Sequence, residues 1–232
     1  MKRILTTLSQ KWPEYLLEIF VITIGILGAF GLNNWNEASK AKRIERELLE
    51  ALHHDLGENI NQMKMVIAFD STIQVRQRDL IEILDSEESV YHDSLKTYFG
   101  YSNRSASFDP QRLAYESIKS MGFNVISDLQ VRNKVIELYD QHYNHFKQSS
   151  ESQSLMFIET SKIYFKHLRG GNSPLEKSPN DFEGLKNNDE FKNVITTLAA
   201  DQNFIIQFHQ NILNKTIETR DLLAAKMNLE LN

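Results

Sequence analysis

The chain has 232 residues, contains no cysteine and carries a formal net charge of −5 at pH 7. Without cysteine, the protein has no disulfide bonds, thiol nucleophiles or cysteine-based zinc sites. Residues 1–36 hold three of the 26 basic and two of the 31 acidic residues, which leaves a net charge of −6 on the rest of the chain. No basic stripe accompanies this acidic balance, which argues against nucleic acid as a partner.

Residues 15–35 are predicted to form a transmembrane helix. Only Glu18 and Thr23 interrupt the apolar character of its first part, and Trp12 and Trp35 bracket it. The two tryptophans are 23 positions apart, which is about 34 Å in an α-helix. This length suits a bilayer with ~30 Å of hydrocarbon and aromatic residues at both interfaces. We therefore expect the lipid bilayer to be a partner, with residues 1–14 as a short tail at its interface.

Two other structures can produce an apolar run near an N-terminus. A cleavable signal peptide fits poorly, because the run exceeds the usual apolar core and Asn33 to Glu37 is not a small-residue cleavage site. A buried core helix fits poorly as well, because tryptophans flank the run and a polar segment follows it.

The orientation of the predicted span follows from the size of the flanking segments more than from charge. Basic residues are nearly balanced on the two sides, with Lys2, Arg3 and Lys11 before the span and Lys40, Lys42, Arg43 and Arg46 after it. A short segment before the span and a long domain after it favour an extracytoplasmic domain, since large domains translocate with little regard to charge. A cytoplasmic domain is the alternative.

Glu18, Gly25 and Ala29 lie on one face of the predicted span. Gly25 and Ala29 form a small-xxx-small pair, which lets two helices approach closely in lipid. An ionisable residue on the same face would then lie at a helix–helix interface and avoid hydrocarbon. Association with a second copy or with another membrane protein is one interpretation, and snorkelling of Glu18 toward the headgroups is the other.

The rest of the chain shows helical periodicity. Apolar residues recur at steps of three and four over residues 36–84, which predicts a long amphipathic stalk helix. Residues 85–232 are predicted to form a helical bundle that packs on the stalk, with loops at about 85–108 and 170–188. The predicted fold is all-α: a single N-terminal transmembrane helix continues into a long stalk helix and an antiparallel helical bundle.

Capping residues and helix breakers predict the bounds of the individual helices. The membrane helix is expected to start at Trp12-Pro13. The bundle helices are expected over Tyr91–Phe99, from Asp109-Pro110 to Gly122, from Ser127-Asp128 to about His167, and as a final pair over Asp189–Ala199 and Gln202–Met227.

Two blocks of the sequence carry a resemblance. The first comprises Tyr15 to Ile19, Ile24 to Ala29 and Asn33 to Glu37, and the second comprises Ala114 to Ser120, Gly122, Ile126 to Asp128 and Leu138-Tyr139. Together they resemble an uncharacterised bacterial family of single-span membrane proteins, domain of unknown function 6090. The resemblance implies an N-terminal anchor, a helical soluble domain and no established activity, and it transfers no catalytic residue.

Four residues of the second block predict a helix corner. Gly122 is expected to end one helix and Asp128 to open the next, while Tyr115 and Glu116 are close enough to brace the corner by hydrogen bonds. A partner-docking or ligand site is the alternative role for this block.

Candidate metal ligands are sparse. His54 and Glu58 lie four apart beside Asp55, and His142 and His145 lie three apart, so each pair shares a helical face. No HExxH pattern is present, and the other ligands would have to come from distant helices. A polar helix flank is the simpler interpretation, and we predict no metal and no cofactor.

An aromatic stripe comprises Tyr139, Tyr143, Phe146, Tyr164 and Phe165. Aromatic residues at helical spacing usually belong to a core. A ligand pocket between helices is the alternative.

The predicted function is that of a non-enzymatic interaction or scaffold protein of the cell envelope. The expected location is the bacterial inner membrane, as a single-pass protein whose C-terminal domain lies in the periplasm; the bacterial origin is what the resemblance implies. A homo-oligomer or a membrane protein is the expected partner. The alternatives are a ligand-sensing helical ectodomain that signals through a membrane partner and, less favoured, an envelope metalloenzyme.

Overall fold

The structure is a computed structural model that describes the backbone of residues 2–229 and the side chains of residues 12–13 and 15–227. Helices contain 82% of the chain, which confirms the all-α prediction. The chain divides into two compact units, residues 1–48 and residues 49–232, and each is described by itself.

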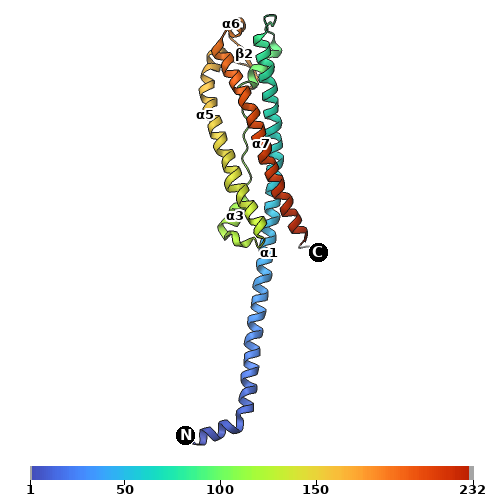
Figure 1. Cartoon of the computed structure of the whole chain (residues 1–232), viewed down its shortest axis with the longest axis vertical. Helices are drawn as coiled ribbons and strands as arrows, with labels where there is room; N and C mark the ends of the chain where they lie inside the picture. The colour runs from blue at the N-terminus through green and yellow to red at the C-terminus, as the bar shows by residue number, and fades with distance from the viewer. Residues whose placement is uncertain (1, 230–232) are drawn as a thin grey trace. The chain divides into compact units, whose positions relative to one another are not determined.

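Residues 1–48 contain the first half of α1 (Lys2–Asp85). The predicted start at Trp12-Pro13 is wrong, because α1 begins at Lys2 and Pro13 lies inside it. A proline in a helix interior lacks the N–H donor and clashes with the preceding turn, so it kinks a helix without always ending it. Figure 1 shows a bend in this N-terminal part of the helix.

Residues 49–232 form a helical bundle around three long helices. These are the second half of α1, α5 (Tyr143–His167) and α7 (Asp189–Leu229). They lie side by side, and α7 runs antiparallel to the other two (Figure 1). The shorter elements are η1 (Asp93–Leu95), α2 (Lys96–Tyr101), α3 (Leu113–Met121), η2 (Phe123–Val125), α4 (Leu129–Ile136), the π-helical η3 (Glu137–His142), β1 (Leu168–Gly170), β2 (Lys177–Pro179) and α6 (Phe182–Lys186).

The core of the bundle follows a heptad pattern on α1. Buried residues alternate at steps of three and four from Leu49 to Leu84, which is the spacing of a helix that packs along one seam. Most are apolar: Leu49, Leu52, Leu56, Met63, Val66, Ile73, Leu80 and Leu84. Three positions of the same seam are polar and buried, namely Asn59, Asp70 and Gln77. The end of this helix at Asp85 confirms the predicted end near Leu84.

The second predicted loop is wrong in part, because residues 170–188 contain β2 and α6. Strand β2 pairs antiparallel with β1, with Leu168 opposite Pro179. Strands of three residues are too short to show an alternating pattern in the sequence. In the first predicted loop, η1 and α2 begin and end slightly later than the predicted Tyr91–Phe99 helix.

The predicted start of α3 at Asp109-Pro110 is also wrong. The helix begins at Leu113, and its capping carboxylate comes from α1, because the Ala114 N–H donates to Asp55 Oδ2 at 3.0 Å. A cap supplied from 59 residues away leaves no local sequence signal.

The predicted final pair of helices is one helix, α7. Neither glycine nor proline lies between Ala199 and Gln202, so nothing breaks the helix there. By contrast, the helix end at Gly122, the start after Asp128 and the end at His167 are confirmed.

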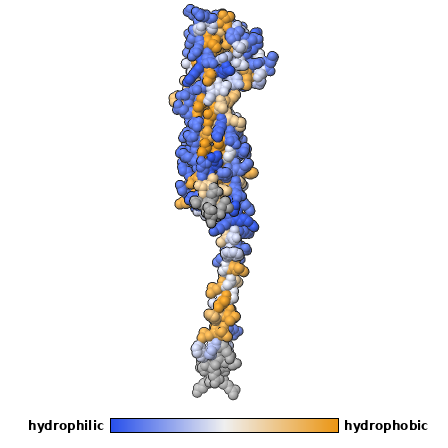
Figure 2. Space-filling model, turned by 90° about the vertical axis from the view of Figure 1, so that its right-hand side faces the viewer, coloured by the Kyte–Doolittle hydropathy of each residue, from blue (hydrophilic) through white to orange (hydrophobic). Residues whose placement is uncertain are grey.

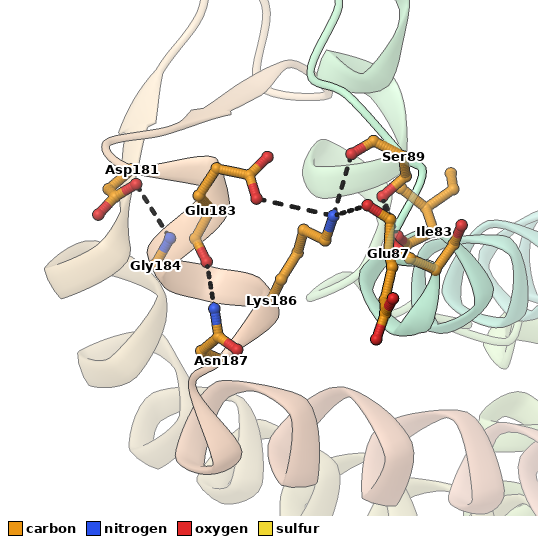
Figure 3. Close-up of polar contacts among 9 residues, drawn as sticks. Ile83, Glu87, Ser89, Asp181, Glu183, Gly184, Lys186 and Asn187 are labelled. Carbon is orange, nitrogen blue, oxygen red and sulfur yellow. Dashed lines mark hydrogen bonds and ion pairs between the residues drawn. The ribbon is translucent and has the colours of Figure 1, made fainter.

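Lys186 links α6 to the segment that follows α1 through hydrogen bonds (Figure 3). Its Nζ donates to the carbonyl oxygens of Glu87 at 2.9 Å and Ser89 at 3.1 Å, and lies 3.6 Å from a carboxylate oxygen of Glu183. A cation at this position also complements the negative end of the α1 dipole. These interactions hold α6 next to the segment that follows α1 at this end of the bundle.

Two glycines should respond in opposite ways to substitution by alanine. A methyl group at Gly100 would overlap the backbone carbonyl of Leu175, so Gly100→Ala should lower the free energy of unfolding by about 1–3 kcal/mol. At Gly57, inside α1, the added Cβ meets nothing within 4 Å, so Gly57→Ala should raise it by about 0.5–1 kcal/mol. Urea denaturation of the full chain measures both values, and a Gly100→Ala protein as stable as the wild type would contradict the packing described here.

Candidate functional site

One helix among the described residues, α1, is long and apolar enough near its start to cross a membrane. Every described side chain from Tyr15 to Leu32 is exposed, and Figure 2 shows apolar residues along this segment. Trp12 and Trp35, which flank it, are 58% and 70% exposed. The side chains of Lys2, Arg3 and Lys11, which entered the orientation argument, lie outside the described residues.

The face of α1 that carries Glu18, Gly25 and Ala29 is open. A Cβ at Gly25 would meet nothing within 4 Å. The Thr23 hydroxyl donates to the Ile19 carbonyl at 2.7 Å, so this polar group is satisfied within the helix. The Glu18 carboxylate has no partner among the described residues, and it is therefore the polar group of this face that needs one.

The helix corner is held by ring stacking. Tyr115 is fully buried, and its ring stacks on Tyr139 with centroids 4.3 Å apart and planes 3° apart. Its Oη has no hydrogen-bond partner among the described residues, and the Glu116 side chain is exposed, so a hydrogen-bonded brace at these two residues stays a prediction. The contact that the structure shows is the stacking of the Tyr115 ring of α3 on the Tyr139 ring of η3.

Burial keeps the tyrosines of this region neutral. It raises the pKa of Tyr115, with a further contribution from the Asp140 carboxylate, and it raises the pKa of Tyr139 and of Tyr164. Burial also raises the pKa of Tyr143 to about 12. Such groups stay protonated and are poorly suited to act as bases at neutral pH.

The rest of the predicted aromatic stripe divides between core and surface. Phe146 is buried with the tyrosines. Phe165, however, is 72% exposed, so its assignment to a buried stripe is wrong.

Gly122 and Asp128 have the local roles that the sequence predicts. Gly122 has a φ of 93°, which other residues rarely adopt. Asp128 accepts from the Val131 N–H at 3.0 Å as a helix N-cap. Its other oxygen lies 2.8 Å from Lys226 Nζ, and this ammonium lowers the pKa of Asp128. The corner is therefore tied to the far end of α7.

The candidate metal ligands do not come together. No group of three or more His, Asp or Glu side chains suited to a metal ion occurs among the described residues. His54, Glu58 and His145 are exposed, and His142 Nε2 lies 3.5 Å from the Glu137 carboxylate. Asp55, their neighbour, caps α3.

A buried, hydrogen-bonded pair of side chains between α1 and α7 was not anticipated from the sequence. The Asp70 and His209 side chains are each 1% exposed, and His209 Nδ1–H donates to Asp70 Oδ2 at 2.8 Å. The His209 ring packs against Phe146 with centroids 4.8 Å apart. The heptad pattern contained the signal, because Asp70 occupies a core position of the α1 seam.

A polar cavity lies next to this pair, one heptad further along the bundle. Gln77 follows Asp70 by seven residues on α1, and Gln202 precedes His209 by seven on antiparallel α7. Both glutamines line a cavity of about 350 Å³, together with residues of α5 and of the turn after α2. The sequence offered no signal for the cavity, because it depends on which helices meet at this level.

These features define the class of protein: a helical bundle whose chain begins with one long, exposed, apolar helix. The model of a family of unknown function, DUF6090, matches residues 18–203, and the chain belongs to this family. The resemblance proposed from two sequence blocks is thus confirmed. The match includes Gln77 and Gln202 and ends before His209. No curated protein and no solved structure matches the chain.

The Asp70–His209 pair should be sensitive to loss of one partner. Asp70→Ala or His209→Ala leaves the other polar group buried without compensation, so each should lower the free energy of unfolding by about 3–5 kcal/mol. The double variant Asp70→Leu/His209→Leu should recover most of this loss, since it removes both polar groups. Urea denaturation measures all three.

Glu58→Ala, at an exposed position of the same helix, serves as the control and should leave stability unchanged. If the single variants were as stable as this control, the pair would not lie in the core.

Proposed function

We propose that residues 15–35 anchor this protein in the bacterial inner membrane as a single span and that the bundle acts in the periplasm as a non-enzymatic interaction or scaffold module. Family membership and an apolar N-terminal helix are the supporting findings. No group of three or more His, Asp or Glu side chains suited to a metal ion occurs among the described residues.

One observation carries the proposal. The described side chains from Tyr15 to Leu32 remain exposed although most of them are apolar, and no other segment of the first unit covers them. An apolar surface of this extent is costly in water, whereas lipid is its natural solvent. Tryptophans at both ends place aromatic rings at the two interfaces.

The face with Glu18, Gly25 and Ala29 is the proposed association surface within the membrane. Gly25 and Ala29 allow a second helix to approach to backbone contact. A neighbouring helix would also shield the Glu18 carboxylate from hydrocarbon. Two copies of this chain meet through the same face in a symmetric pair, so a homodimer is the simplest assembly.

Topology tests the location of the bundle. The chain contains no cysteine, so a single Asn172→Cys substitution in the exposed segment after β1 gives one labelling site. In cells with a permeabilised outer membrane and an intact inner membrane, a membrane-impermeant maleimide should label it. Ile22→Cys, within the span, should stay unlabelled. Labelling of Asn172→Cys only after lysis would place the bundle in the cytoplasm and overturn the periplasmic location.

Crosslinking in membranes tests association. The wild-type chain should give a dimer, and Gly25→Leu should reduce the dimer fraction about tenfold, because a large side chain separates the helices. Gly31→Leu, on another face of the helix, should leave the dimer unchanged. A wild-type chain that gives only monomer, or equal loss in both variants, would contradict the proposed face.

A further inference from the structure

The cavity beside Gln77 lies where the large buried side chains of α5 give way to smaller polar ones. Elsewhere α5 fills the bundle with Tyr143, Phe146 and Tyr164, which are all buried. Between them it presents Ser149, Ser152 and Gln153, which line the cavity. Serine is much smaller than tyrosine or phenylalanine, so a space of about 350 Å³ remains between α1, α5 and α7.

Two unpartnered amide groups line this space. Gln77 is 1% exposed, and its Nε2 donates to the Ser102 carbonyl at 2.9 Å. This bond identifies Oε1 as the other atom of the amide, and Gln77 Oε1 has no hydrogen-bond partner among the described residues. Gln202 is 4% exposed, and its Nε2 has no hydrogen-bond partner in the part of the chain that the structure describes. Buried polar atoms without a partner are rare and costly, so the two atoms mark an acceptor and a donor that await a ligand.

The remainder of the lining restricts the chemistry of that ligand. Its charged residues are one cation, Arg104, and one anion, Asp201. The Arg104 guanidinium is already bonded to the carbonyl oxygens of Gly100 and Pro174. A neutral molecule therefore fits better than an ion. Apolar surface is contributed by Met156, Phe157, Leu198, Phe204 and Ile205.

We infer that this cavity binds a small neutral molecule that carries an amide group and an apolar body. The N–H of the amide donates to Gln77 Oε1, its carbonyl accepts from Gln202 Nε2, and its apolar part packs against α5 and α7. The volume lies within the range of ligand sites, roughly 300–1,000 Å³. It exceeds the ~30 Å³ of one water molecule about tenfold, so a single bridging water does not fill it.

Entry to the cavity passes side chains that can move. Met156 and Phe157 are 39% and 36% exposed, and Phe204 is 70% exposed. Both amide atoms are buried, so a ligand contacts them only when side chains of the lining move, and flexible Met156 is suited to such a movement. The inference concerns the bundle alone and is independent of membrane anchoring. It assigns a binding site to the alternative function given in the sequence analysis, that of a ligand-sensing helical domain.

A matched pair of probes tests the inference on the full chain in lipid nanodiscs. 2-Phenylacetamide supplies a phenyl ring and a primary amide, and phenylacetone replaces the amide NH₂ by a methyl group. Saturation-transfer NMR, with empty nanodiscs as background, should show phenylacetamide bound with a Kd of about a millimolar. Phenylacetone should bind about fivefold more weakly or worse, because it cannot donate to Gln77.

Variants locate the site. Gln202→Met should weaken phenylacetamide binding about fivefold without lowering the urea midpoint, since it removes an unpartnered buried amide. Gln207→Met, at an exposed position of the same helix, should change neither value. The inference is overturned if the wild type does not bind phenylacetamide, if both probes bind equally, or if Gln202→Met binds as the wild type does. The probe comparison needs no variant, so it stands even if Gln202→Met fails to fold.

Discussion

Three buried polar side chains on α1 need hydrogen-bond partners, and the arrangement of the bundle depends on this need. Asn59 exchanges hydrogen bonds with the backbone of Gln111, Asp70 binds His209, and Gln77 binds the Ser102 carbonyl. Leaving such a group unpaired costs about 1–3 kcal/mol, more for a charge. Each bond therefore selects one alignment of the segment packed against α1. Apolar contacts along the seam tolerate sliding far better, so these polar positions set the register.

The α1 seam includes Gln77, and the bundle is incompletely filled around this residue. Large aromatic side chains occupy the levels on either side, with Phe146 near the Asp70–His209 pair and Phe191 in the apolar cluster at the other end. Between them, serines on α5 face two glutamines, and neither glutamine has all its hydrogen bonds. A bundle built only for stability would fill this level with apolar side chains. The ligand inferred above would supply the hydrogen bonds that the two glutamines lack.

Apolar residues are distributed differently in the two units. In the first, apolar residues between Tyr15 and Leu32 are exposed on all sides of the helix, as expected for the proposed membrane span. In the second, they are confined to a seam, as water requires. The sequence distinguished the two because this difference lies in local periodicity. It failed at α3, whose capping Asp55 is distant in the chain, and at β1 and β2, which are too short to show a pattern.

The sequence by itself determined the helical class, the apolar N-terminal segment, the family and the helix ends at Gly122, Asp128 and His167. These features follow from periodicity and capping, which act over a few neighbouring residues. Only the tertiary structure decided that Asp70 meets His209 and that Gln77 and Gln202 share a cavity. Those pairings join residues more than a hundred positions apart, and they depend on the alignment of antiparallel helices, which no local pattern records.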